Sequence, residues 1–285
     1  MLTSTAPPGR LVPFLLVLLP ATFLLVFFVI PTAFLLSASF IESDGVIMTG
    51  VWTTANYTDL LSRPLYQQAI LRTFLIGLGV GVTVVVLSYP LAYFLVRTPS
   101  RWRGLLIALS LSPLLASVIV RTYGWWVILN REGAVNSALL TLGLIDQPLV
   151  MLPSSMAIVI GLSHALLPYG VLTIMASLNG LNPNLERAAM SLGAGRTRTF
   201  LTVTLPLTWP GIVGGFLLAF AVAISAYATP AILGGPGTQV MATLIRSFMV
   251  QALDWALGSA MGAILLVSSI ALLLLTSALG NRRTA

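Results

Sequence analysis

Six long apolar stretches constrain the fold of this 285-residue chain more than any other feature. A helix that crosses a membrane needs about 20 mostly apolar residues, because the hydrocarbon core is about 30 Å thick. The stretches that reach this length are residues 11–40, 69–96, 104–129, 153–178, 208–230 and 255–280. The sequence therefore predicts an all-α membrane protein, with six transmembrane helices in a single domain over residues 1–285.

The first stretch also has to be compared with a cleavable signal peptide, because it follows a short polar segment that ends at Arg10. The apolar region of a signal peptide is about 7–15 residues long. Residues 11–40 are uncharged over a far greater length. We therefore expect a retained transmembrane helix.

Composition supports a membrane location and excludes several kinds of chemistry. The chain is 58% hydrophobic and 7% charged, whereas globular chains carry about 25% charged residues. All 14 basic residues are arginine, and the sequence contains neither lysine nor cysteine. The missing lysine excludes a Walker A phosphate loop and a Schiff-base enzyme, and the missing cysteine excludes thiolate chemistry. With one histidine as well, we expect no catalytic residue, metal site or cofactor site on this chain.

The distribution of charge between the loops predicts the orientation, because cytoplasmic loops of membrane proteins are enriched in arginine and lysine. The loops on one side hold Glu186 and nine arginines, namely Arg10, Arg97, Arg101, Arg103, Arg187, Arg196, Arg198, Arg282 and Arg283. Those on the other side hold six acids, namely Glu42, Asp44, Asp59, Glu132, Asp146 and Asp254, with Arg63, Arg131 and Arg246. This asymmetry predicts that both termini are cytoplasmic. The arginines are dispersed over several short loops, which indicates contact with membrane lipid and no nucleic-acid partner.

The loop at residues 179–206 carries the signals of a short helix on the cytoplasmic side. Asn182 can cap the helix, Pro183 suits its first position, and Glu186 is favoured near its positive end. Gly193 ends it, as a left-handed C-terminal cap would. Small and apolar residues recur along it at helical spacing: Leu185, Ala188, Ala189 and Leu192. The pattern is compatible with a helix that rests on lipid headgroups and with one that docks on a partner protein.

The same loop resembles the EAA loop of binding-protein-dependent ABC importer permeases. The resemblance rests on residues 186–194 and 203–206, in which Ala188, Ala189, Gly193, Leu205 and Pro206 match the family spacing. Two positions differ, because Arg187 stands where the family has glutamate, with Glu186 one place earlier, and Val203 replaces isoleucine. The resemblance implies that nine residues couple the permease to an ATPase: Glu186, Arg187, Ala188, Ala189, Leu192, Gly193, Ala194, Leu205 and Pro206.

A second resemblance, over about residues 70–275, is to the spermidine/putrescine-type branch of these permeases. It is carried by residues 117–125, by Gly133, Asn136 and residues 142–144, and by residues 167–169 and 232–236. It implies the type I importer permease fold in a bacterial inner membrane. The implied partners are two ATP-binding cassette subunits that hold ATP and magnesium, a second and related permease, and an extracytoplasmic solute-binding protein. The implied cargo is a polyamine or a related amine or amino-acid-like solute.

Four residues are candidates for the translocation pathway: Arg121, Tyr123, Tyr169 and Tyr227. A charge within a span is a functional candidate by default, although Arg121 could equally fix its own span by pairing with a carbonyl or an acid. Arg72 lies near a span end, where its side chain is expected to reach the interface. His164 is expected to be a hydrogen-bonded packing residue. No acid lies within the predicted spans, which weakens a polyamine assignment.

Three classes of function remain. The permease subunit of an ATP-driven importer is favoured, with the ATPase on other chains. A stand-alone secondary transporter or channel is the alternative, although it would require intramembrane acids or a discontinuous ion-binding helix. An intramembrane enzyme is third, because the sequence has no HExxH motif, no paired intramembrane aspartates and no Ser–His arrangement.

Overall fold

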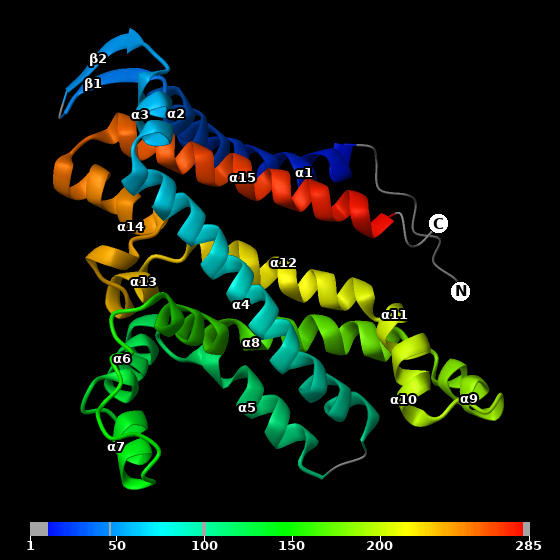
Figure 1. The fold of residues 1–285 in the computed structure, drawn as a ribbon. Helices are drawn as coiled ribbons and strands as arrows, with labels where there is room; N and C mark the ends of the chain where they lie inside the picture. Colours follow the sequence, from blue (N-terminus) through cyan, green and yellow to red (C-terminus); the bar gives the residue numbers. More distant parts are fainter. Residues whose placement is uncertain (1–10, 46, 99–100, 282–285) are drawn as a thin grey trace. The chain divides into compact units, whose positions relative to one another are not determined.

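A computed structural model describes residues 11–45, 47–98 and 101–281, with side chains from residue 16 to residue 272 and at residue 274. Arg10, Arg282 and Arg283, which contribute to the predicted orientation, lie outside the described residues. The described chain is mostly helical (Figure 1), which confirms the predicted class. Four helical segments are long and apolar enough to cross a membrane, and up to six if each of two bent helix pairs is one span. The six-span count and the placement of the termini stay predictions.

The four long segments coincide with predicted spans. The first is a continuous helical stretch made of α1 (Leu11–Leu24), the π-helical η1 (Leu25–Val29) and α2 (Ile30–Ala38). The others are α4 (Pro64–Arg97), α8 (Ser155–Gly180) and α15 (Trp255–Asn281). Pro31 follows the π-helical turn, and its missing N–H accounts for the local change of hydrogen-bond pattern.

Residues 104–129 do not form the continuous helix expected from the sequence. The segment divides into α5 (Arg103–Leu115) and α6 (Val118–Leu129), and the path bends by 101° at the break. Ala116 and Ser117 between them are extended, with ψ angles of 139° and 134°. In a continuous helix the backbone N–H of Ser117 would donate to the carbonyl of Pro113, and this hydrogen bond is lost at the break.

The fifth stretch, predicted at 208–230, also ends earlier than expected. Helix α12 (Trp209–Ser225) stops before Ala226, and α13 (Ala228–Leu233) is a separate short helix. Pro230 explains the interruption, because it cannot donate to the carbonyl four residues earlier and its ring would clash with that carbonyl. The stretch before α12 bends by 61° relative to it and contains three short elements: α10 (Arg196–Thr199), η2 (Phe200–Thr204) and α11 (Leu205–Leu207).

One feature absent from the sequence prediction is a small antiparallel hairpin. Strand β1 (Ile41–Asp44) pairs with β2 (Ile47–Trp52), and the Asn56 side chain donates to the backbone carbonyls of Ser39 and Ile41 beside it. The remaining elements are short, and they are α3 (Ala55–Ser62), α7 (Ala134–Thr141), α9 (Pro183–Ser191), η3 (Pro236–Thr238), α14 (Met241–Arg246) and η4 (Ser247–Ala252).

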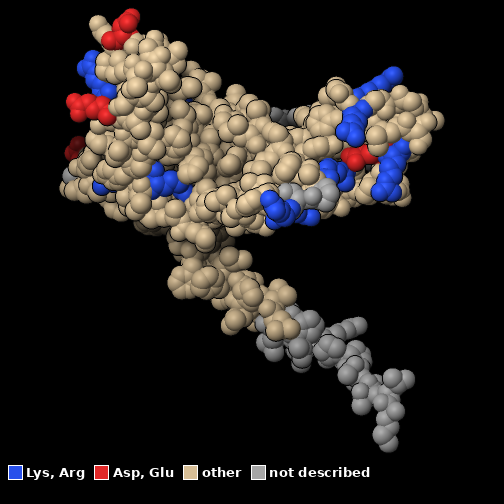
Figure 2. All heavy atoms as spheres, turned by 90° about the horizontal axis from the view of Figure 1, so that it is seen from below, with Lys and Arg blue, Asp and Glu red and all other residues tan. Residues whose placement is uncertain are grey.

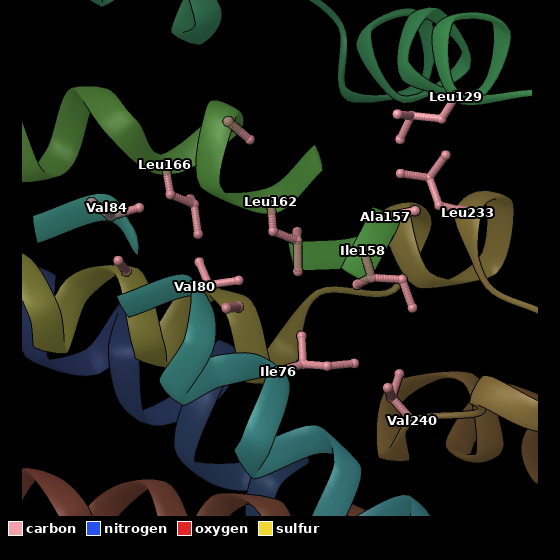
Figure 3. Packing of buried hydrophobic residues seen from close by; sticks show 13 residues of the cluster. Ile76, Val80, Val84, Leu129, Ala157, Ile158, Leu162, Leu166, Leu233 and Val240 are labelled. Atoms are coloured by element: carbon pink, nitrogen blue, oxygen red, sulfur yellow. The ribbon is translucent and has the colours of Figure 1, made fainter. Parts of the chain in front are cut away.

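The described residues form two compact units, and the candidate site lies within one of them. The first unit comprises residues up to 61 together with 245–264, and the second comprises residues 62–244 together with those from 265 onward. In the second unit, helices α4, α8 and α12 pack against one another. Side chains of α4, α6, α8 and α13 point toward one another in its core (Figure 3), among them Val80, Ile158, Leu162 and Leu233.

Glycines allow the three packed helices to approach closely. A Cβ added at Gly211 of α12 would lie 2.4 Å from the Cβ of Ser177 in α8. A Cβ added at Gly81 of α4 would lie 2.7 Å from the ring of Phe216. By contrast, a Cβ at Gly214 would have no neighbour within 4 Å. The short interhelical distances therefore depend on particular glycines, as in other membrane helix bundles.

Candidate functional site

Helix α9, at the end of the second unit, has the boundaries that the sequence predicts. The Asn182 side chain accepts a hydrogen bond from the backbone N–H of Asn184 at 3.0 Å, and Pro183 is the first helical residue. At the other end Gly193 has a φ of +88°, with hydrogen bonds from its N–H to the Met190 carbonyl and from the next N–H to the carbonyl of Ala189. This pair of bonds is a Schellman motif, which stops the helix and satisfies its last carbonyls.

The outward face of α9 is apolar and basic. Leu185, Met190 and Leu192 are exposed, and Leu192 reaches 89% exposure. Arg187 and Ala188 are also exposed, whereas Ala189 and Ala194 are half-buried. The predicted stripe of small and apolar residues therefore lies mainly on the open surface of the described chain. Such an arrangement of large exposed apolar side chains is typical of an interaction surface.

Glu186 points in the opposite direction and joins α9 to the rest of the second unit. Its Oε1 accepts hydrogen bonds from Nη2 of Arg97, the last residue of α4, at 3.0 Å and from Oγ1 of Thr204 in η2 at 2.7 Å. The side chains of Arg97 and Glu186 are 18% and 14% exposed. This contact was not predicted, because 89 residues separate the two partners in the sequence.

The C-terminal part of the loop is anchored in the helix bundle. Phe200 of η2 makes edge-to-face contacts with Tyr89 and Tyr93 of α4, with ring centroids 5.7 and 5.5 Å apart. Leu205 packs against the core cluster that contains Tyr89, while Pro206 is exposed at the start of α11. Thus Leu205 is partly buried, and α9 projects from a base at the end of α4, α8 and α12 (Figure 1).

A cavity of about 360 Å³ lies among α5, α6, α8, α12 and α13. Three of the four predicted pathway residues line it, namely Arg121, Tyr169 and Tyr227. Tyr123 does not line it and is 54% exposed elsewhere on α6. Arg121 is the only charged side chain among the described lining residues, and the other polar groups are the hydroxyls of Tyr169, Tyr227, Ser225 and Thr229. The pathway role of all four residues stays a prediction.

Arg121 also has a structural contact. Its Nη1 donates to the backbone carbonyl of Pro113, which lies in the last turn of α5. That carbonyl has lost its helical partner at the break between α5 and α6, and a basic side chain is favoured at a helix C-terminus. The guanidinium has five N–H donors, so this bond leaves other donors at the cavity.

Arg72 and His164 both make contacts between segments of the second unit. Arg72 is half-buried and its Nη1 donates to the carbonyl of Gln239 at 3.0 Å, which ties α4 to the segment before α14. Its position at the membrane interface stays a prediction. His164 accepts a hydrogen bond from Nε1 of Trp125 at 3.2 Å through its Nδ1, with the two rings edge to face. His164 is therefore hydrogen-bonded between α6 and α8, as the sequence predicts, but it is exposed rather than packed in the interior.

Two further polar contacts were not predicted. The hydroxyls of Thr122 in α6 and Thr229 in α13 lie 3.2 Å apart in a buried position beside the cavity. The hydroxyls of Tyr89 in α4 and Thr208 before α12 lie 2.9 Å apart. Buried hydroxyls need hydrogen-bond partners, but a single sequence does not indicate which distant hydroxyl will supply one.

Comparison with known proteins identifies the family, although no family model matches the sequence. The spermidine/putrescine transport system permease protein PotB of Escherichia coli (strain K12) is 33% identical over 238 residues, which cover 83% of this chain and 86% of PotB. A chain of a bacterial ABC transporter involved in the import of the acidic polysaccharide alginate shares the fold. It has a TM-score of 0.78 at 18% identity, with 96% of each chain covered.

A bacterial alginate ABC transporter in complex with alginate pentasaccharide-bound periplasmic protein also contains a chain with this fold. That chain has a TM-score of 0.77 at 18% identity, with 95% of this chain and 94% of that chain covered. These structural likenesses concern the fold, whereas the identity to PotB over most of both chains establishes relationship. The chain is thus a multi-pass membrane protein that belongs to the spermidine/putrescine-type branch of the permease subunits of binding-protein-dependent ABC importers.

Proposed function

We propose that this permease forms part of the translocation pathway of an ATP-driven importer in a bacterial inner membrane. In this proposal both termini and α9 are cytoplasmic, and an extracytoplasmic binding protein delivers the solute on the other side. A second, related permease completes the pathway. The observation that supports the coupling role most strongly is the geometry of α9. This capped helix is fixed to α4 through Glu186, and its exposed apolar side chains are left open.

Helix α9 would be the element through which two separate ATPase subunits move the permease. A helix transmits displacement only if its base is fixed, and here Glu186 and Phe200 fix the loop to α4. Closure of the docked ATPases would then move the helix bundle between inward-facing and outward-facing states. ATP and magnesium would bind on those partners, and the permease would be non-catalytic, because the sequence lacks the lysine that a phosphate loop requires.

The solute is proposed to be a polyamine or a related amine or amino-acid-like compound. The name of the E. coli relative supports an amine. The cavity beside Arg121 has no acidic lining residue in the described chain, so an amine in it would be bound by hydroxyl and carbonyl oxygens. Competition for uptake among spermidine, putrescine and zwitterionic amino acids would separate these classes, and uptake unaffected by all of them would contradict the proposed cargo.

Replacing Gly193 with proline tests the coupling role. Proline fixes φ near −65° and has no N–H, whereas this position has a φ of +88° and its N–H is bonded to the Met190 carbonyl at 3.0 Å. The variant should lose permease-stimulated ATP hydrolysis and solute uptake in proteoliposomes. Binding of the loaded solute-binding protein should remain.

Gly143 offers a matched control, because it follows α7 in the same backbone motif. Its φ is +67°, its N–H is bonded to the Leu140 carbonyl, and the N–H of Leu144 is bonded to the Leu139 carbonyl. Gly143→Pro should keep the ATPase stimulation that Gly193→Pro loses. Normal stimulation and uptake in Gly193→Pro would overturn the assigned role of α9.

A further inference from the structure

The basic side chains of the α9 loop are exposed, whereas its acidic side chain faces α4. Arg187 on α9 and Arg196 and Arg198 on α10 are exposed, and in the described chain none of the three is paired with an acidic side chain. Figure 2 shows arginine side chains gathered on the surface at the end that carries these two helices. The acid of the loop, Glu186, is 14% exposed and lies against Arg97. The open surface of this loop is consequently basic.

Glu186 is committed to contacts within its own chain. Arg97 Nη2 and Thr204 Oγ1 donate to the same carboxylate oxygen at 3.0 and 2.7 Å. The buried Nε of Arg97 has no hydrogen-bond acceptor among the described residues, so Glu186 is the acidic partner on which this guanidinium depends. The ion pair is partly buried, and losing one member would leave the other charge poorly compensated, so exchanging Glu186 from Arg97 to an outside partner would be unfavourable.

The apolar part of the same surface lies beside its charges. Met190 lies one turn from Arg187 and is exposed beside it, while Leu185 and Leu192 are exposed on another side of this short helix. A complementary partner surface therefore needs an apolar floor for these side chains and acidic groups at its edge for the arginines. Charge complementarity of this kind affects association rate and partner choice more than it affects total affinity.

We infer that the permease meets its ATPase with a positively charged surface formed by Arg187, Arg196 and Arg198, and that the ATPase groove carries carboxylates facing it. Glu186 is a positioning residue that holds α9 on α4 and makes no contact with the ATPase. This inference rests on the proposed function and extends it, because it assigns the sign of the charge on each side of the interface. It also gives Arg187 and Glu186 opposite roles, although they are adjacent in the sequence.

The positive surface is tested by measuring the affinity of the partner ATPase for the full-length permease in nanodiscs of neutral phosphatidylcholine. Arg187→Glu should weaken binding roughly tenfold at low salt, because it replaces attraction by repulsion. The difference should shrink as salt rises, since exposed charges are screened. Arg131→Glu, a charge reversal at an exposed arginine in the segment between α6 and α7, is the matched control and should bind as the wild type does.

Three results would overturn the positive surface. Equal affinity of Arg187→Glu and wild type is one, and a loss of affinity that is independent of salt is another. The third is a charge effect that appears with anionic lipid and vanishes in phosphatidylcholine, because lipid headgroups would then be the occupant. If the wild-type permease binds no ATPase at all, the proposed function fails, and this outcome differs from all three.

The role of Glu186 is tested with a double-mutant cycle that combines Glu186→Gln and Arg97→Gln. The readouts are ATPase affinity and the number of ATP molecules hydrolysed per solute imported. Each single variant should raise the number of ATP molecules hydrolysed per solute at least threefold, while the ATPase affinity changes less than twofold. The double variant should resemble each single variant, because the two substitutions remove the same contact. Glutamine retains an acceptor for Thr204. If Glu186→Gln does not fold, Thr204→Val tests the same carboxylate in the same assay.

A contact between Glu186 and the ATPase would give a different pattern. Glu186→Gln would then weaken ATPase binding severalfold, and it would do so equally in the Arg97→Gln background. A role in stability alone would lower the melting temperature and leave the ratio of ATP to solute unchanged. Either pattern would overturn the assignment of Glu186 as a positioning residue.

Discussion

Gly211→Ala is expected to destabilise the bundle, although alanine is the better helix former. A Cβ at this position would lie 2.4 Å from the Cβ of Ser177 and 2.9 Å from the carbonyl oxygen of Thr173. Favourable contacts between carbon atoms lie at about 3.5–4.0 Å. Both opposing atoms belong to α8 at positions that rotation of a side chain cannot move. The two helices must therefore separate to accommodate one methyl group.

Gly214 of the same helix is the matched control, because a Cβ there would have no neighbour within 4 Å. Overpacking costs about 1–3 kcal/mol. The gain in helix propensity from glycine to alanine, about 1 kcal/mol, applies to both variants and cancels in the comparison. Gly211→Ala should thus be about 1–3 kcal/mol less stable than Gly214→Ala.

The assay is thermal unfolding of the two purified variants and the wild type in one detergent, followed by circular dichroism. For a chain of this size, 1 kcal/mol corresponds to a shift of about 2–4 °C in the melting temperature. Gly211→Ala should melt roughly 2–12 °C below Gly214→Ala. Equal melting temperatures, or a higher one for Gly211→Ala, would refute the packing of α8 on α12 at this glycine.

Two further substitutions test local contacts of the loop and its base. Gly193→Ala should increase the rate of hydrogen exchange of the α9 amides about fivefold, because a left-handed conformation costs an L-residue about 1 kcal/mol. The control is Gly195→Ala, at a φ of −65°, which should leave the exchange rate unchanged. Tyr89→Phe should lower the free energy of unfolding by about 1 kcal/mol, because the hydrogen bond to Thr208 is lost. The control is Tyr123→Phe, at a 54% exposed residue, which should change the free energy of unfolding by less than about 0.5 kcal/mol. Unchanged exchange in the first case, or equal stability of the two tyrosine variants in the second, would contradict the contacts described.

The boundaries of α9 were predictable because local signals determine them. Asn182 caps, Pro183 begins and Gly193 ends the helix through bonds that span no more than five residues. The four long helices were predictable for a similar reason, since length and apolar composition decide them within each segment. The break in residues 104–129 was missed, although Pro113 was visible, because transmembrane helices often tolerate proline.

Contacts between distant segments could not be derived from one sequence. The pair formed by Arg97 and Glu186 depends on how α9 folds back to the end of α4. Likewise, Arg121 was recognised as an unusual charge, but its bond to Pro113 exists only because the helix breaks between them. Arg121, Tyr169 and Tyr227 were candidates for the pathway, but their meeting around one cavity depends on how the helices pack. Tyr123, the fourth candidate, lies outside that cavity.

The central claim is that this permease moves its solute only when a separate ATPase acts through α9. The most direct measurement is uptake of labelled spermidine into proteoliposomes that contain the permease pair and the binding protein, with and without the ATPase and ATP. We expect uptake only in the complete system, and its loss when the complete system carries Gly193→Pro. Accumulation of solute by the purified permease without any ATPase would contradict the account and would identify a self-contained transporter.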